Sequence, residues 1–194
     1  MFAAGVPTCG NVHEAVPRAK VLYTDIDSVN IQLGREILAS NPNADYTFCD
    51  ATNLDTLEQL VVDEVLEPIY CLGIIFLGIS AFITDETLAN TLDKLYDWVP
   101  VGSFMALDFD GEAALKYPKL LKLLEDMDAP LVMRNPTRIR PLLGRWQLTE
   151  HGILPVEAWQ AEAGANLIET KEPVFSYGCV VYKPQEEQIT SRDA

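Results

Sequence analysis

Residues 20–38 have the sequence KVLYTDIDSVNIQLGREIL, and this stretch decides the fold class. Its first part, Lys20–Thr24, is rich in residues that favour β-strands. Asp27 or Ser28 then offers an N-cap for a helix. The apolar residues that follow recur at helical spacing, and they are Val29, Leu33, Ile37 and Leu38. The stretch therefore predicts a strand followed directly by an amphipathic helix.

The same alternation continues along the chain. Further strands are predicted at Asp45–Cys49, Cys71–Ile79 and Ser103–Phe109. Amphipathic helices are predicted at Leu54–Leu66 and after Thr84, which can cap the second of them. The strand at residues 71–79 is apolar throughout, as expected where both faces of a parallel sheet are covered. The alternation indicates an α/β fold with a doubly wound, mostly parallel sheet.

The last third of the chain changes character. Helices are predicted at Glu112–Met127 and Thr137–Leu143, and Gly144 ends the second of them. The segments Trp146–Leu154 and Val174–Tyr182 then predict two strands, and no strong helical pattern lies between them. Two strands without a crossover helix favour an antiparallel hairpin at the sheet edge.

The composition narrows the class of protein. Of 194 residues, 48% are hydrophobic and 22% are charged, which is typical of a packed globular protein and excludes a wholly disordered one. No internal repeat divides the chain, so we expect one domain over residues 1–184 and a polar, flexible tail over residues 185–194. The longest apolar run is too short to cross a bilayer, and no secretory signal pattern is present. We therefore expect a cytoplasmic protein with no membrane partner.

The charge balance argues against a nucleic-acid partner. With 29 acidic and 14 basic residues, the net charge is -15, which repels phosphate backbones. The basic residues form one loose cluster, which consists of Arg134, Arg138, Arg140 and Arg145. For the last three we expect a solvated helix face, with binding of an acidic acceptor as the alternative. Carboxylates are dispersed and only 2 histidines occur, so no metal site is predicted. The cysteines, which lack CxxC spacing and are expected to be buried free thiols, are Cys9, Cys49, Cys71 and Cys179.

The candidate ligand-binding residues follow the predicted strands, because open α/β sheets bind ligands beyond the carboxyl ends of their strands. Asp25 lies 20 residues after Gly5, close to the spacing at which an acidic residue reaches a ribose hydroxyl in dinucleotide-type folds. Asp50 and Ala51 follow the next strand, where a carboxylate or a backbone amide can meet the edge of an adenine ring. The competing interpretation is that each aspartate only caps a helix.

Several segments, in order, carry a resemblance to a known family. They are MFAAGVPTCGNVHEAV at 1–16, KVLYTDIDSVNIQLGREIL at 20–38, FCDAT at 48–52, GISAFITDETL at 78–88, VPVGSFMALDF at 99–109, LPVEAW at 154–159 and FSYGCVVYKP at 175–184. They resemble a bacterial family of S-adenosylmethionine-dependent methyltransferases, formerly a domain of unknown function of the 574 type. That family shows a PT-x-x-N-x-HE segment, a YxDxD strand end and a D-A/L pair after the third strand. The resemblance covers nearly the whole chain.

The resemblance implies the class I methyltransferase fold, which is Rossmann-like with a reversed C-terminal hairpin, and S-adenosylmethionine as cofactor. It implies that Asp25 holds the ribose hydroxyls, that Ile26 packs on the adenine, and that Asp50 and Ala51 meet the adenine edge. Gly78 and the residues after it, to Phe82, are implied to border both cofactor and acceptor. The residues implied to approach the methionine part or to line that end of the pocket are Ala3, Ala4, Gly5, Thr8, Asn11 and His13.

The N-terminus departs from the family pattern. The family's glycine loop follows a central strand that ends in an acidic residue, whereas Met1 stands at that place here. The loop contains Ala3, Ala4 and Gly5 where the family has Gly-x-Gly. We therefore expect a shortened chain in which the first strand is missing. Because unpaired buried backbone groups are costly, we expect either weakened cofactor binding or a homodimer that covers the gap.

The predicted function is S-adenosylmethionine-dependent methyl transfer to an unidentified small-molecule acceptor. Such a transfer depends on alignment more than on acid or base, so no catalytic residue is assigned. His13 is a candidate base, with a capping or surface role as the alternative. A non-catalytic binding or regulatory protein on the same scaffold is the alternative function. A nicotinamide-dependent oxidoreductase is also considered, although its glycine-rich fingerprint and usual proton donor are missing from the sequence.

Overall fold

The computed structural model describes residues 1–54, 71–127, 129, 131–160 and 173–185. The stretch that decides the fold class forms β1 (Val21–Asp25) and α2 (Ser28–Leu38), as predicted. The carboxylate of Asp27 accepts a hydrogen bond from the Val29 N–H at 2.7 Å and so caps α2. β2 (Ala44–Phe48) follows and pairs in parallel with β1.

The next unit consists of β3 (Gly73–Phe76), α4 (Asp85–Trp98) and β4 (Phe104–Asp110). The Thr84 hydroxyl accepts a hydrogen bond from the Thr87 N–H at 3.2 Å, which confirms the predicted cap of α4. The helix predicted at residues 54–66 lies almost wholly outside the described residues.

The third strand is shorter than the one predicted at residues 71–79. Gly78 adopts a φ of 75°, which only glycine reaches easily, so the chain turns away from the sheet. It then forms a short 3-10 turn, η1 (Ser80–Phe82), before α4 begins.

The helix predicted at residues 112–127 is divided in two. A 3-10 segment, η2 (Glu112–Lys116), ends at Tyr117, and α5 (Pro118–Asp126) begins at the proline. Pro118 lacks an N–H and fits the first turn of a helix but not its interior, which explains the break. α6 (Pro136–Leu142) corresponds to the predicted short helix.

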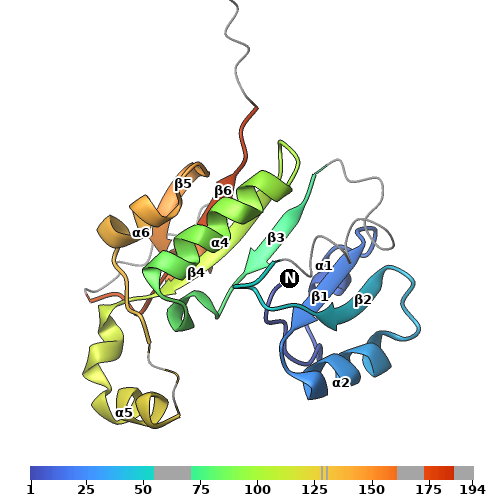
Figure 1. The fold of residues 1–194 in the computed structure, drawn as a ribbon, viewed down its shortest axis with the longest axis horizontal. Helices are drawn as coiled ribbons and strands as arrows, with labels where there is room; N and C mark the ends of the chain where they lie inside the picture. The colour runs from blue at the N-terminus through green and yellow to red at the C-terminus, as the bar shows by residue number, and fades with distance from the viewer. Residues whose placement is uncertain (55–70, 128, 130, 161–172, 186–194) are drawn as a thin grey trace, which may run out of the picture.

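The final strands are β5 (Gln147–Pro155) and β6 (Ser176–Tyr182), with a 3-10 segment, η3 (Val156–Gln160), after β5. Hydrogen bonds group the strands into a parallel pair, β1–β2, and a four-stranded sheet in the order β3-β4-β6-β5 (Figure 1). β3 and β4 are parallel, whereas β6 runs antiparallel to both β4 and β5. The predicted hairpin at the sheet edge is thus confirmed.

The N-terminal segment lies between the two sheets. The Met1 amino group donates to the Leu22 carbonyl at 2.8 Å, and the Thr24 N–H donates to the Met1 carbonyl at 2.9 Å. On the other side, the Phe2 N–H donates to the Ile75 carbonyl of β3 at 3.0 Å. Residues 1–4 therefore stand as a short link at the place where the sequence predicted a missing strand.

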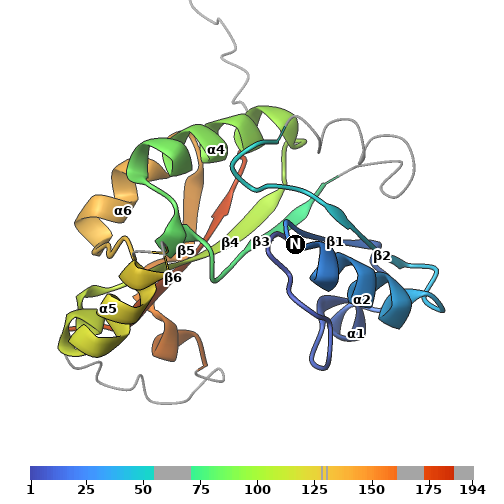
Figure 2. The ribbon, with the colours of Figure 1, turned by 60° about the horizontal axis from the view of Figure 1, so that its bottom comes forward.

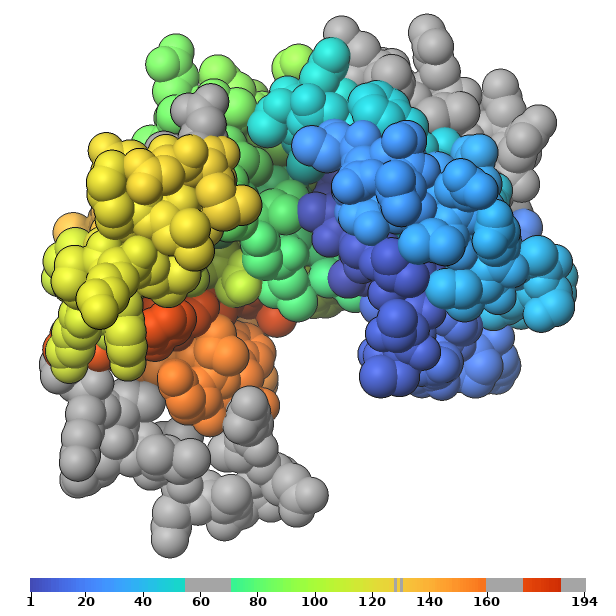
Figure 3. All heavy atoms as spheres, turned by 90° about the horizontal axis from the view of Figure 1, so that it is seen from below, coloured from blue at the N-terminus to red at the C-terminus, as the bar shows by residue number. Residues whose placement is uncertain are grey.

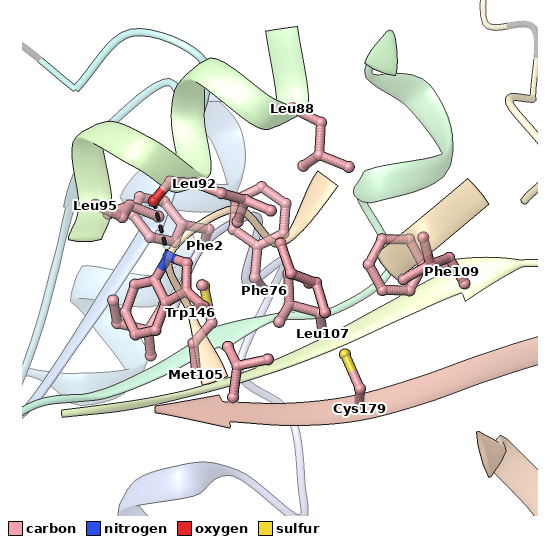
Figure 4. Packing of buried hydrophobic residues seen from close by; sticks show 14 of the residues in the cluster. Phe2, Phe76, Leu88, Leu92, Leu95, Met105, Leu107, Phe109, Trp146 and Cys179 are labelled. Carbon is pink, nitrogen blue, oxygen red and sulfur yellow. Dashed lines mark hydrogen bonds between the residues drawn. The ribbon is translucent and has the colours of Figure 1, made fainter. Parts of the chain in front are cut away.

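Helices cover the strands from both sides. Figure 2 shows α4 and α6 on one side and α1 (Val12–Ala15), α2 and α5 on the other. The larger apolar core lies under α4, where the Trp146 indole donates to the Leu92 carbonyl at 2.8 Å (Figure 4). A smaller core between α2 and its two strands consists of Val21, Tyr23, Ile31, Leu38 and Tyr46.

The burial of the cysteines and the apolarity of the helices were also predicted from the sequence. Cys49 and Cys179 are buried as expected, whereas Cys9 and Cys71 are exposed. Across the described ranges, no helix combines the length and apolarity that crossing a bilayer requires.

Candidate functional site

The site is centred on the loop that follows the N-terminal link. Ala3 has a φ of 47° and Gly5 a φ of 61°, so the chain bends sharply out of the plane of the strands. The Ala4 N–H still donates to the Thr24 carbonyl at 3.0 Å, and the Gly5 N–H donates to the Asp25 carboxylate at 3.0 Å. Gly5 and Asp25, which the sequence linked by their spacing, are therefore in direct contact.

Asp25 is the last residue of β1 and is 8% exposed. Its carboxylate also accepts the Asp27 N–H at 3.0 Å and the Asn30 side-chain amide at 3.4 Å. These donors hold the carboxylate at the carboxyl end of the strand. Ile26 follows it and is 65% exposed, which leaves an apolar side chain uncovered beside the acid.

A buried tyrosine of β2, Tyr46, holds the same loop by a hydrogen bond. The Tyr46 hydroxyl donates to the Gly5 carbonyl at 2.8 Å, and the side chain is 0% exposed. Gly34 of α2 makes room for the ring, because a Cβ there would stand 2.2 Å from a ring carbon. Burial, followed by the Asp25 carboxylate, raises the pKa of Tyr46 above its ordinary value. The hydroxyl thus keeps its proton and remains a donor.

The segment after Gly5 leads into α1. The Tyr23 hydroxyl accepts the His13 N–H at 3.1 Å and lies 2.8 Å from the His13 Nδ1. Asn11 precedes α1, and its N–H donates to the Glu14 carboxylate at 2.8 Å. His13 therefore packs against β1, and Asn11 takes part in starting a helix. Thr8 lies exposed in the loop between Gly5 and Asn11.

Asp50 and Ala51 follow β2, the strand beside β1. The Cys49 N–H donates to the Asp25 carbonyl at 3.1 Å, which keeps this strand end next to Asp25. The Asp50 carboxylate accepts the Thr52 N–H at 2.8 Å and the Thr52 hydroxyl at 2.7 Å. It thus closes its own turn, while the competing role of a helix cap concerns the helix predicted at residues 54–66, which lies almost wholly outside the described residues.

Gly78 lies past β3, on the other side of the N-terminal link. Its N–H donates to the Asp108 carboxylate of β4 at 2.7 Å. Burial raises the pKa of Asp108, and burial together with Asp108 raises the pKa of Asp110. Figure 3 shows a broad hollow between the lobe of α1 and α2 and the lobe of α5 and η3, with the residues after β3 between them.

The basic cluster has a structural role. Arg134 is 1% exposed and donates to the Ile83 carbonyl at 2.6 Å, to the Ser80 carbonyl at 2.8 Å and to Asp85 at 2.8 Å. Arg138 shares the same Asp85, at 2.6 Å. Arg145 pairs with Asp93 at 2.8 Å and with Asp97 at 2.6 Å. These contacts brace the segments around α4. Arg138 and Arg145 are already paired with carboxylates, which argues against an acidic acceptor there, and Arg134 is buried rather than on a solvated face.

Sequence reasoning did not identify Tyr46, Asp108 or Asp110. Tyr46 looks like an ordinary core residue of its strand, and its partner Gly5 is 41 residues away. Asp108 and Asp110 stand alternately in β4 and so share one face, a signal that period-two spacing offers. Within the described ranges, no group of three or more potential metal ligands comes together.

Comparisons with known proteins agree with this geometry. A family model described as S-adenosyl methyltransferase matches residues 2–184. A solved structure from Streptomyces avermitilis, of the domain of unknown function 574 family, has a TM-score of 0.78 and 22% identity, over 94% of this chain and 74% of that chain. No curated protein is similar enough to this chain to count as a match.

More distant structures share the architecture. A SAM-dependent methyltransferase from Anabaena variabilis has a TM-score of 0.61 and 14% identity, over 94% of this chain and 75% of that chain. Magnesium protoporphyrin IX methyltransferase from Synechocystis, solved with bound SAH, has a TM-score of 0.57 and 14% identity, over 94% of this chain and 71% of that chain. At these identities the likeness concerns the fold.

Proposed function

This chain belongs to the S-adenosyl methyltransferase family and has the class I methyltransferase fold, and from this premise we propose that it methylates a small-molecule acceptor. S-adenosylmethionine is the methyl donor and cofactor of the family. The observation that carries the proposal is the contact between Gly5, in the loop after the N-terminal link, and Asp25, at the carboxyl end of β1. This edge is where open α/β sheets bind nucleotides.

The residues at this edge fit the nucleoside part of the cofactor. A carboxylate has about four lone-pair positions, so Asp25 can still accept from a ribose hydroxyl beside its two short backbone contacts. At Gly5 and Gly78 nothing stands within 4 Å of the place where a Cβ would be, so the backbone borders open space there. Ile26 offers an exposed apolar side chain on which an adenine ring can pack.

When bound, S-adenosylmethionine supplies a methyl group activated by its sulfonium charge. The chain's contribution is mainly positioning, because such a transfer depends on alignment. Asp25 would orient the ribose, while Ile26 and the strand end at Asp50–Ala51 would flank the adenine. Asp108 is the candidate proton acceptor, because its carboxylate lies beside Gly78, whose N–H it accepts at 2.7 Å, and burial raises its pKa.

Three features support a small acceptor and a cytoplasmic location. The net charge of -15 opposes binding of nucleic acid, whereas the hollow beside the residues after β3 leaves space for a small molecule (Figure 3). The four cysteines, all within the described residues, are in no disulfide, as is usual in a reducing compartment.

A binding protein without catalysis is the second candidate. It is favoured by the N-terminal link, which consists of a few residues and contains Ala3 in a left-handed conformation. A link of a few residues makes fewer backbone hydrogen bonds than a full strand would, and so holds the loop after it less firmly for the alignment that methyl transfer needs. Binding of cofactor without turnover of any acceptor would support this candidate.

Calorimetric titration with S-adenosylmethionine and S-adenosylhomocysteine tests the proposal. We expect saturable binding by the unmodified chain and its loss in Asp25→Ala. Asp97→Ala is the matched control, because Asp97 lies on α4, on the other side of the sheet from the Asp25 loop, where it pairs with Arg145. Absence of binding by the folded, unmodified chain would contradict the proposed function.

A further inference from the structure

Two buried tyrosine hydroxyls hold the two ends of one loop. Tyr46 donates to the Gly5 carbonyl at 2.8 Å, and Tyr23 contacts both the N–H and the Nδ1 of His13, at 3.1 Å and 2.8 Å. The two rings are stacked, with centroids 6.0 Å apart. We infer that Tyr46 and Tyr23 are positioning residues that fix the loop from Gly5 to His13 against Asp25, an inference that rests on the proposed role of this loop in cofactor binding.

The contacts of Gly5 explain why Tyr46 matters most. Its N–H is held by Asp25 and its carbonyl by Tyr46, so both polar groups of the residue are fixed. Glycine is the residue with the greatest conformational freedom, and its φ of 61° is one of many conformations open to it. Without the hydroxyl of Tyr46, only the Asp25 contact would hold this turn. Binding would then include the cost of ordering it.

The packing keeps the hydroxyl of Tyr46 in place. The ring is fully buried in the smaller core, between Tyr23 on one side and α2 on the other. Gly34 lets the backbone of α2 approach the ring closely. Arg35 adds a contact from the same helix, donating to the Tyr46 carbonyl at 2.7 Å. The tyrosine therefore has little freedom to move away from Gly5.

At the other end, Tyr23 fixes the ring of His13. Its hydroxyl oxygen accepts the His13 N–H, and its own proton can be donated to Nδ1 in the tautomer in which that nitrogen carries no proton. Burial raises the pKa of the Tyr23 hydroxyl, so it keeps this proton at neutral pH. The loop thus has one anchor at each end, both from the face of the smaller core.

Substituting single hydroxyls tests the inference. Tyr46→Phe keeps the ring and removes one hydrogen bond, so we expect S-adenosylhomocysteine to bind about five- to tenfold more weakly, with a melting temperature close to that of the parent. Tyr23→Phe should weaken binding less, because its partner lies farther along the loop from Asp25. Tyr182→Phe is the matched control, since its hydroxyl contacts Gln147 in the C-terminal hairpin.

A measurement without cofactor separates this inference from the proposed function. In the free chain, the Gly5 amide should exchange with solvent at least fivefold faster in Tyr46→Phe than in the parent, while amides of β4 and β6 exchange unchanged. An unchanged Gly5 amide, or unchanged S-adenosylhomocysteine affinity in Tyr46→Phe, would overturn the inference. If the parent binds no S-adenosylhomocysteine, the proposed function fails, and the Gly5 amide still decides whether Tyr46 fixes the loop.

Discussion

The four-stranded sheet and the two-stranded sheet are stabilised in different ways. The first packs against α4 and α6, and the core between them contains most of the buried apolar side chains, including Leu88 of α4, Leu107 of β4 and Ile139 of α6. The second packs against α2 with a smaller core, and the described chain joins it to the first through residues 1–4. The candidate cofactor residues lie mainly on the second sheet and at the junction between the two sheets, which consists of residues 1–4 and their hydrogen-bonded neighbours in β1 and β3. Ligand binding and local stability should therefore be coupled there.

The largest expected effect concerns Phe76, a residue of the larger core that packs against the junction. Phe76 of β3 is 0% exposed, and its ring lies 5.7 Å from that of Phe2. Phe76→Ala removes a large buried ring and, with it, the contact between β3 and Phe2 of the N-terminal link. We therefore expect it to lower the free energy of unfolding by about 3–5 kcal/mol. Chemical denaturation measures this.

Phe82→Ala is the control for that variant, because Phe82 is 52% exposed. Its stability should stay within about 1 kcal/mol of the parent. Equal losses in the two variants would contradict the role given to Phe76.

Gly34→Ala tests the smaller core. The added Cβ would meet the Tyr46 ring at 2.2 Å, which outweighs the better helix propensity of alanine. We expect a loss of up to about 3 kcal/mol, with faster amide exchange in β1 and β2 than in β4 and β6. Gln32→Ala, at an exposed position of the same helix, should change little. A stabilised Gly34→Ala variant would contradict the observed packing.

The junction should also respond to pH. Burial lowers the pKa of the Met1 amino group from 8.0 to about 5. As the pH falls below 8, the amino group of the unfolded chain therefore becomes protonated, whereas that of the folded chain stays neutral until the pH is near 5. Stability is therefore greatest above pH 8 and falls as the pH falls. Between pH 8 and pH 6 we expect a loss of about 2 kcal/mol.

Denaturation curves at pH 8, 7 and 6 measure this loss. Asp108 and Asp110 act in the opposite direction, since their raised pKa favours the folded state as the pH falls from the raised pKa toward the ordinary range of carboxyl groups. Stability that is flat or rises from pH 8 to pH 6 would show that the amino group is not buried in solution.

The smallest expected effect concerns strain in the loop. Ala3 has a φ of 47°, which costs an L-residue roughly 1–2 kcal/mol. Ala3→Gly should relieve this strain and raise stability by about 0.5–1 kcal/mol after the entropic penalty of glycine. Ala4→Gly relieves no such strain and should lower stability by a similar amount. Thermal denaturation of the two variants shows whether their changes in stability have opposite signs. Changes of the same sign would contradict the left-handed conformation of Ala3.

Local signals explain why much of the fold was predictable. The cap at Thr84, the alternation of strands and helices and the antiparallel pairing of β5 with β6 all follow from patterns in neighbouring residues. The break at Pro118 was also visible in the sequence, because proline ends a helical pattern, and the predicted helix ran through it. The early turn at Gly78 had the same kind of signal.

The site was less predictable because its contacts are long-range. Spacing and family resemblance pointed to Asp25 and Gly5, and the structure brings them together. The contact of Tyr46 with Gly5 joins residues far apart in sequence, and tyrosine in a strand indicates only a buried surface. The place of Met1 between two strands likewise depends on packing of the whole sheet, which local patterns do not contain.

The most direct test of this account compares amide exchange in the two sheets with and without saturating S-adenosylhomocysteine. We predict that the ligand slows exchange most at Gly5, Asp25 and Asp27 and through β1 and β2, and changes β5 and β6 least. Exchange that stays the same on adding the ligand, or slows equally in both sheets, would contradict the claim that the cofactor binds at the junction and stabilises the smaller sheet.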